Sequence, residues 1–230
     1  MIKPNGVHHL AISTADIKGQ IAYFTDVLGM ELVALYWMHG VDGYWHGFVK
    51  ASDSCYIAFV ESSAMKTIPA ELGITHAGSG GGTSAPGTMQ HVALNVDTDE
   101  ELLAMRDRIR SRGVNVFGPI DHGMCKSMYF AGPENLTLEI ATSAEPINVR
   151  AWIDPEVIKL AGISDEELAR FTKPAAFTDR GGQVAQPAID PAKPHMHYPP
   201  QQYAAMMGMA DADVLAKASH TTPPVVLAAE

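Results

Sequence analysis

The stretch that decides the fold occurs twice, as Gly6-Val7-His8-His9-Leu10-Ala11-Ile12-Ser13 and as Thr88-Met89-Gln90-His91-Val92-Ala93-Leu94-Asn95. Each copy places a histidine before an alternating apolar run, which is typical of a half-buried β-strand. Aligning His-Leu-Ala-Ile with His-Val-Ala-Leu makes His9 and His91 equivalent and turns His8 to the other face of its strand. The two stretches therefore predict an internal repeat of a whole structural module.

A helix and further strands are expected after each copy. Apolar residues at helical spacing predict one helix that Gly29 ends, and a capping box of Thr98 and Glu101 opens another that Gly113 ends. The strands expected next are 31–33 and 55–60 in the first copy, and 114–116 and 136–140 in the second. There are 49 positions from His9 to Ala58 and 48 from His91 to Glu139, so the copies keep one register.

This pattern predicts an α+β fold of two βαβββ modules, at about 5–62 and 88–142, that form one curved, cup-shaped mixed sheet within a domain of residues 1–143. A glycine-rich segment, residues 77–84, lies between them and reads either as a slack linker or as a lid over a pocket. Residues 144–230 hold 10 of the 15 prolines and are expected to be an irregular, partly helical extension. Helices are expected after Ser164 and after Pro200. We expect this extension to pack on the domain or on a partner subunit.

Three polar residues stand where strand alternation calls for apolar ones: His9, His91 and Glu139. A carboxylate that faces a core is costly unless it is paired or bound to a metal. The repeat would bring all three side chains to one concave face. Two imidazoles and one carboxylate with open positions beside them are the ligand set of non-haem Fe(II) oxygenases, and Zn(II) is the alternative metal.

Composition narrows the class of protein. A formal net charge of −10 argues against a nucleic-acid partner. There is no apolar run long enough to cross a membrane and no secretory signal at the start. Cys55 and Cys125 are too few for a disulfide framework, so a cytoplasmic location is expected. His195 and His197 in the extension could suggest a second metal site, but a docking segment is the favoured interpretation.

The paired His-φ-Ala-φ openings, the helix end at 26–30 and the stretch 129–139 resemble the vicinal oxygen chelate superfamily over residues 5 to 142. That superfamily includes glyoxalase I, bleomycin resistance proteins and extradiol dioxygenases. Glyoxalase-like members usually carry a further glutamate where this chain has Ala58, and Glu61 is expected to lie beyond that strand. The resemblance is therefore closest to the extradiol dioxygenases. Their signature matches His122, Met128, Tyr129, Pro133 and Glu139, with departures at Gly132 and Asn135.

This resemblance implies an Fe(II)-dependent ring-cleaving dioxygenase that acts on a catecholic or related aromatic substrate with dioxygen. Its metal would be held by His9, His91 and Glu139, with His122 as acid–base partner and Tyr129 as hydrogen-bond partner of the substrate. Mn(II), Zn(II) and Ni(II) are the alternative metals. A glyoxalase-type lyase, isomerase or epimerase and a non-enzymatic drug-binding protein are the alternative functions. A homodimer or higher homo-oligomer is expected. About half of the following five residues are expected to line the pocket: Tyr36, Trp37, Tyr44, Trp45 and His46.

Overall fold

A computed structural model describes residues 2–182 and 184–226 of the chain. The chain divides into two compact units. One comprises residues 4–173, and the other comprises the first three residues together with residues 174–230. The larger unit contains both predicted modules together with residues 144–173.

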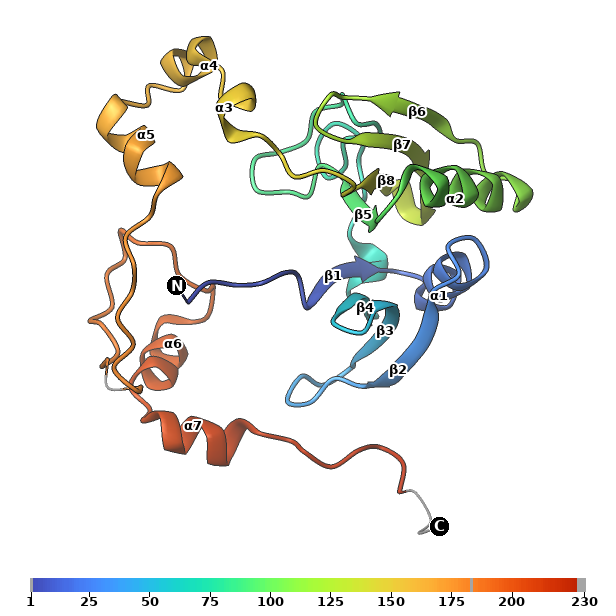
Figure 1. The fold of residues 1–230 in the computed structure, drawn as a ribbon. Coiled ribbons are helices and arrows are strands. Elements are labelled where there is room, and N and C mark those ends of the chain that lie inside the picture. Colours follow the sequence, from blue (N-terminus) through green and yellow to red (C-terminus); the bar gives the residue numbers. More distant parts are fainter. Residues whose placement is uncertain (1, 183, 227–230) are drawn as a thin grey trace. The chain divides into compact units, whose positions relative to one another are not determined.

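The first module contains four strands and one helix (Figure 1). The strand order is β1-β4-β3-β2, with β1 parallel to β4 and the other neighbours antiparallel. Helix α1 begins after Asp16, whose carboxylate accepts a hydrogen bond from the Gly19 N–H, and ends near Gly29, whose φ of +79° is left-handed. The elements are β1 (His9–Thr14), α1 (Ile17–Asp26), β2 (Glu31–Trp37), β3 (Tyr44–Ser52) and β4 (Cys55–Ser62), with a short 3-10 turn η1 (Met65–Thr67) after them.

The second module repeats this order, so its sheet reads β5-β8-β7-β6 with β5 parallel to β8. The predicted capping box is confirmed, because Thr98 and Glu101 exchange hydrogen bonds at the start of α2. The elements are β5 (Val92–Val96), α2 (Asp99–Ser111), β6 (Phe117–Asp121), β7 (Lys126–Ala131), a 3-10 turn η2 (Pro133–Asn135) and β8 (Thr137–Thr142).

The α+β class and the two βαβββ modules are confirmed, with one four-stranded mixed sheet in each module. One prediction was wrong: residues 114–116 are not a strand, and β6 begins at Phe117. Val114 and Val116 instead pack against the core from the turn after α2, and the Val114 N–H donates to the Ile109 carbonyl oxygen. Their alternation therefore reflects burial in a connection.

A single hydrophobic core joins the two modules, because side chains from both helices and both sheets belong to one packed cluster. Burying such side chains is the main force that holds the modules in register. The largest fully buried apolar members are Phe24, Phe59, Ile57, Leu102, Ile109, Met128, Leu138 and Ile140. Glu139 lies between two members of this core, Leu138 and Ile140, so its side chain points to the opposite face of β8.

Short helices follow the second module within the larger unit. They are α3 (Val149–Trp152), α4 (Pro155–Leu160) and α5 (Asp165–Thr172). The last is the helix expected after Ser164, and a capping box of Ser164 and Glu167 opens it. The smaller unit contains α6 (Pro200–Met207), which was expected after Pro200, and α7 (Asp211–Ala218). Among the residues that the structure describes, no helix is long and apolar enough to cross a membrane.

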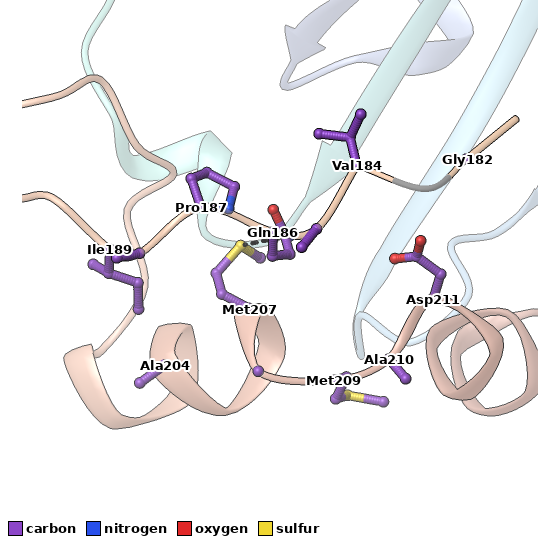
Figure 2. A pocket seen from close by; sticks show the side chains of 13 residues that line it. Gly182, Val184, Gln186, Pro187, Ile189, Ala204, Met207, Met209, Ala210 and Asp211 are labelled. Atoms are coloured by element: carbon purple, nitrogen blue, oxygen red, sulfur yellow. Dashed lines mark hydrogen bonds between the residues drawn. The ribbon is translucent and has the colours of Figure 1, made fainter. Parts of the chain in front are cut away.

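The smaller unit has an open surface hollow of about 700 Å³, and Figure 2 shows the side chains around it. The Gln186 amide points toward the Met207 sulfur at 3.7 Å (Figure 2). None of the described residues between Pro174 and Val226 is buried, so this segment lacks a core of its own. Whether it packs on the domain or on a partner subunit stays a prediction.

Candidate metal and substrate site

The strand register makes the two modules equivalent residue by residue. Ala11 of β1 is paired with Ala58 of β4, and Ala93 of β5 is paired with Glu139 of β8. The two candidate histidines each stand two positions before these paired alanines, so they project to the same side as the pair. Ala58 is therefore the counterpart of Glu139, as the spacing predicted, and it offers no ligand.

His91 and Glu139 lie together in the second module. The His91 Nε2 is 2.9 Å from the Glu139 Oε2. The Glu139 side chain is buried, with 5 % of the residue exposed, and such a carboxylate needs a partner because losing its water is costly. An imidazole nitrogen and a buried carboxylate that face each other are two of the donors that a divalent metal requires.

His9 lies on the equivalent position of the first module, in a different environment. Its ring lies 5.4 Å from the Phe48 ring and 6.5 Å from the His46 ring, and its Nδ1 lies 2.9 Å from that of His8. Among the described residues, no three His, Cys, Asp or Glu side chains are grouped closely enough to share a metal ion. The structure thus joins two of the three proposed ligands and places the third among aromatic rings.

His46 is the buried polar residue of this aromatic group, with 9 % of it exposed. Burial, and then the nearby charge of His9, lower the pKa of His46, and its Nε2 has no hydrogen-bond partner in the described structure. Register pairs Tyr36 with His46 and Trp37 with Trp45, so these two pairs project to opposite faces. Tyr36 and His46 share the face of His9, since their rings are 6.0 Å apart and His46 contacts His9.

His122 and Tyr129 form a second polar pair in the same module as His91. The His122 Nε2 is 3.3 Å from the Tyr129 hydroxyl and 3.1 Å from the Ser127 hydroxyl. The Tyr129 ring also lies 6.1 Å from the His91 ring. Burial raises the pKa of Tyr129, a hydrogen bond with Ser127 acts against this, and the charge of Glu139 adds to the rise, so the phenol keeps its proton at neutral pH.

A cavity of about 580 Å³ opens beside this pair. Its walls combine aromatic rings with glycine backbone, and a pocket of this size suits a small organic molecule. The glycine-rich segment (residues 77–84) forms part of the wall. Its position at the cavity is the one that the lid interpretation requires. The lining residues are Gly78, Ser79, Gly80, Gly81, Phe117, His122, Tyr129, Phe130, Ala131 and Thr137.

Glu61 differs from its predicted place. It lies inside β4, which extends to Ser62, and it is 3 % exposed. Being three positions after Ala58, it projects to the opposite face of the sheet, where it accepts a hydrogen bond from the Ile17 N–H at 2.8 Å and pairs with Lys66. Glu61 is thus a structural cap of α1 and is turned away from the proposed ligands.

In the smaller unit, His195 contacts other residues of the same unit. Its Nδ1 is 2.9 Å from the Lys193 carbonyl oxygen, and its ring lies 5.8 Å from the Tyr203 ring. His197 has no part in a metal-binding group within the described residues. The favoured interpretation of this pair as part of a docking segment stays a prediction.

Three residues that contribute to the site were not predicted from the sequence: Gln90, Ser127 and Phe48. Gln90 hydrogen-bonds to the ring of its neighbour His91, and Ser127 to His122. Strand alternation could have indicated Ser127, because it lies two positions before Tyr129 on β7 and so shares its face. No comparable signal marks Gln90, since its role depends on a segment about ten residues earlier in the chain.

Fold and site together define a paired βαβββ protein with a histidine–carboxylate pair on one sheet face and a cavity beside the neighbouring Tyr129. The family model described as Glyoxalase/Bleomycin resistance protein/Dioxygenase superfamily matches residues 6–140, and this chain belongs to that superfamily.

Individual relatives are distant. The chain is 24% identical over 151 residues, which are 64% of this chain and 68% of the relative, to biphenyl-2,3-diol 1,2-dioxygenase 2 of Rhodococcus globerulus. A glyoxylase/bleomycin resistance protein/dioxygenase domain from Frankia sp. EAN1pec superposes with a TM-score of 0.47 at 13% identity, over 61% of this chain and 98% of that one. The fosfomycin resistance protein FosX of Listeria monocytogenes, solved with Mn(II) and sulfate, gives 0.41 at 16%, over 61% and 94%.

Proposed function

We propose that this protein is an Fe(II)-dependent ring-cleaving dioxygenase of the extradiol type, acting on a catecholic or related aromatic substrate. The observation that carries the proposal is the buried carboxylate of Glu139 facing the His91 Nε2, 2.9 Å away, on the sheet face that also holds Tyr129. His9, at the equivalent position of the first module, would complete the ligand set. This requires the His9 side chain to leave its aromatic neighbours and to approach His91 and Glu139.

The donor set fits a divalent metal. Two neutral imidazoles and one carboxylate on one side leave positions open, and the buried Glu139 gains a cation in place of lost hydration. A bound Fe(II) would supply a centre that holds both oxygens of a catechol beside dioxygen. Mn(II), Zn(II) and Ni(II) suit the same donors less specifically, so metal analysis belongs in the test.

The protein's own groups have defined tasks in this proposal. Tyr129, whose phenol keeps its proton, donates a hydrogen bond to a substrate hydroxyl oxygen at the mouth of the cavity. His122, within 3.3 Å of Tyr129, exchanges a proton with the substrate as general acid and base. Phe117 and the glycine-rich backbone of residues 78–81 line the cavity beside these two groups and would contact an aromatic ring bound there.

Ala58 argues for this reaction over a glyoxalase-type isomerase. It holds the position that mirrors Glu139 and is fully buried, so a second carboxylate ligand is missing from the first module. An isomerase that depends on that ligand would be disfavoured here. The dioxygenase pattern needs only the one carboxylate.

A second candidate is a ligand-binding protein that does not turn its ligand over. The observation in its favour is the aromatic environment of His9, where the Tyr36 ring stacks on that of Phe48 at 6.3 Å with the planes 7° apart. Stacked rings suit capture of a flat aromatic compound without chemistry. In that case the histidine positions would bind the ligand by hydrogen bonds.

The deciding experiment is anaerobic purification with Fe(II), metal analysis, and a screen of catechols for oxygen uptake and the yellow ring-cleaved product. Iron retention at about one ion per chain with oxygen uptake is the expected result. His91→Ala should lose both metal and turnover. Tight binding of catechols by a metal-free protein, with no oxygen consumed, would replace the dioxygenase proposal with the binding protein. Activity on hemithioacetals with nickel or zinc would replace it with the isomerase.

A further inference from the structure

Gln90 makes hydrogen bonds in two directions from one side chain. Its Oε1 accepts from the His91 Nδ1. Its Nε2 lies 3.1 Å from the Ser79 carbonyl oxygen, 3.0 Å from that of Gly80 and 3.1 Å from that of Gly82. Because an amide nitrogen can only donate, the three carbonyl groups fix which end of the amide faces His91.

This orientation keeps a proton on the His91 Nδ1. It leaves the Nε2, which faces the Glu139 carboxylate 2.9 Å away, as the nitrogen that a metal would take. Hydrogen bonds of this kind to the far nitrogen of a ligand histidine hold the ring in place and raise its basicity. The Gln90 amide therefore lies where it can hold the His91 ring in the orientation that metal binding would need.

The other end of Gln90 holds the glycine-rich segment in a tight turn. The Gly82 N–H donates to the Ser79 carbonyl oxygen at 3.1 Å, and a Cβ at Gly82 would lie 2.0 Å from the Ala77 carbonyl oxygen, so only glycine fits. A Cβ at Gly80 would lie 3.0 Å from the Tyr129 ring. The turn is thus packed against the residue that we assign to the substrate.

We propose that Gln90 is a positioning residue that couples the metal ligand His91 to the glycine-rich wall of the substrate cavity. The inference rests on the proposed function for the metal role of His91. With a metal held at the Nε2, the His91 ring would be fixed, and the Gln90 amide that bonds to it would then hold the segment 78–82 more firmly at the cavity.

Two substitutions separate the hydrogen bond between Gln90 and His91 from the hydrogen bonds of Gln90 to the glycine-rich segment. Gln90→Glu keeps an acceptor for the His91 Nδ1 but removes the donors to the three carbonyl oxygens. Gln90→Met has a similar length and removes both. Gln202→Met, at an exposed position of α6, is the matched control. Two quantities are measured on the full-length protein: zinc affinity by competition with a chelator, and hydrogen–deuterium exchange of the peptide that spans residues 78–82, without and with zinc.

In the wild-type protein, zinc should slow exchange across residues 78–82 several-fold. Gln90→Met should weaken zinc affinity by about 10- to 100-fold, the usual effect of removing such a support, and should speed exchange in the metal-free protein. Gln90→Glu should bind zinc about as tightly as wild type while its segment exchanges as fast as in Gln90→Met. Gln202→Met should match wild type in both measurements.

Wild-type zinc affinity in Gln90→Met would overturn the support of His91, and wild-type exchange in Gln90→Glu would overturn the hold on the segment. Exchange that zinc does not alter in the wild type would overturn the coupling. A wild-type protein that binds no zinc, iron or manganese would refute the proposed function and the coupling with it. The hold on the segment would still be judged separately, from exchange of the metal-free variants.

Discussion

The Thr14 hydroxyl donates a 2.5 Å hydrogen bond to the Glu134 carboxylate, although 120 positions separate the two residues. The same carboxylate accepts from the Ala15 N–H at 2.8 Å and from the Gln20 side-chain amide at 2.7 Å. Glu134 stands in η2 of the second module, with a left-handed φ of +52°, and all three donors belong to the first module. One side chain therefore fastens the two modules together.

Replacing Glu134 by Gln should lower the free energy of unfolding by about 2–4 kcal/mol, because hydrogen bonds to a charged acceptor contribute more than neutral ones. Urea unfolding followed by tryptophan fluorescence would measure the loss. Glu145→Gln, at an exposed position, serves as the control and should change stability by less than about 0.5 kcal/mol. Equal stability of Glu134→Gln and wild type would contradict the role of Glu134 as a clamp.

Glu61 should make stability depend on pH in the acid range. Burial opposes its charge, but hydrogen bonds from Lys66 and the Ile17 N–H prevail, so its pKa lies below the ordinary 4.5. A lowered folded-state pKa stabilises the protein above the unfolded-state pKa, and this contribution is lost as the pH falls through the folded value. Glu61→Gln should cost about 2 kcal/mol at pH 7. Urea titrations at pH 7 and below pH 4 should show the gap to wild type closing; a constant gap would refute the assignment.

Tyr129 should affect turnover and leave metal binding nearly unchanged. Tyr129→Phe keeps the ring that packs on Gly80 and removes only the hydroxyl beside His122. Iron content should stay at the wild-type level, while kcat on a catechol that the wild type cleaves should fall by about 10- to 100-fold, the range for losing one hydrogen bond in the transition state. Loss of iron from Tyr129→Phe would place the hydroxyl among the metal ligands instead.

His122 should affect turnover and leave metal binding nearly unchanged. His122→Gln keeps a hydrogen-bonding side chain near Ser127 but cannot exchange protons, so kcat should fall by about 10²- to 10⁴-fold. Iron content, measured by metal analysis, should stay at the wild-type level. A variant with the wild-type kcat would show that His122 is not the acid–base group.

Removal of residues 174–230 tests the extension. None of the described residues in that range is buried, so the unit 4–173 should keep its thermal midpoint to within a few degrees. If the extension makes the subunit contact, as we expect, sizing by light scattering should change from a dimer or larger oligomer to a monomer. An unchanged oligomer would assign the contact to the larger unit.

Local sequence patterns predicted most of the elements, because capping and periodicity act over a few residues. The capping boxes at Thr98 and Ser164 are present, and so is the left-handed stop at Gly29. The strand at 114–116 was mispredicted, since an apolar alternation reports burial and does not by itself report hydrogen-bonded pairing.

The amino-acid sequence by itself determined the repeat, and through its spacing the equivalence of His9 with His91 and of Ala58 with Glu139. Spacing carries this information because strand register counts residues along the chain. Only the tertiary structure decided which side chains meet. In the folded chain Glu61 caps α1 on the opposite face of the sheet, and His9 lies among aromatic rings. Gln90 forms hydrogen bonds to both His91 and the glycine-rich segment. Those contacts depend on the packing of segments far apart in the chain, and no local pattern encodes that packing.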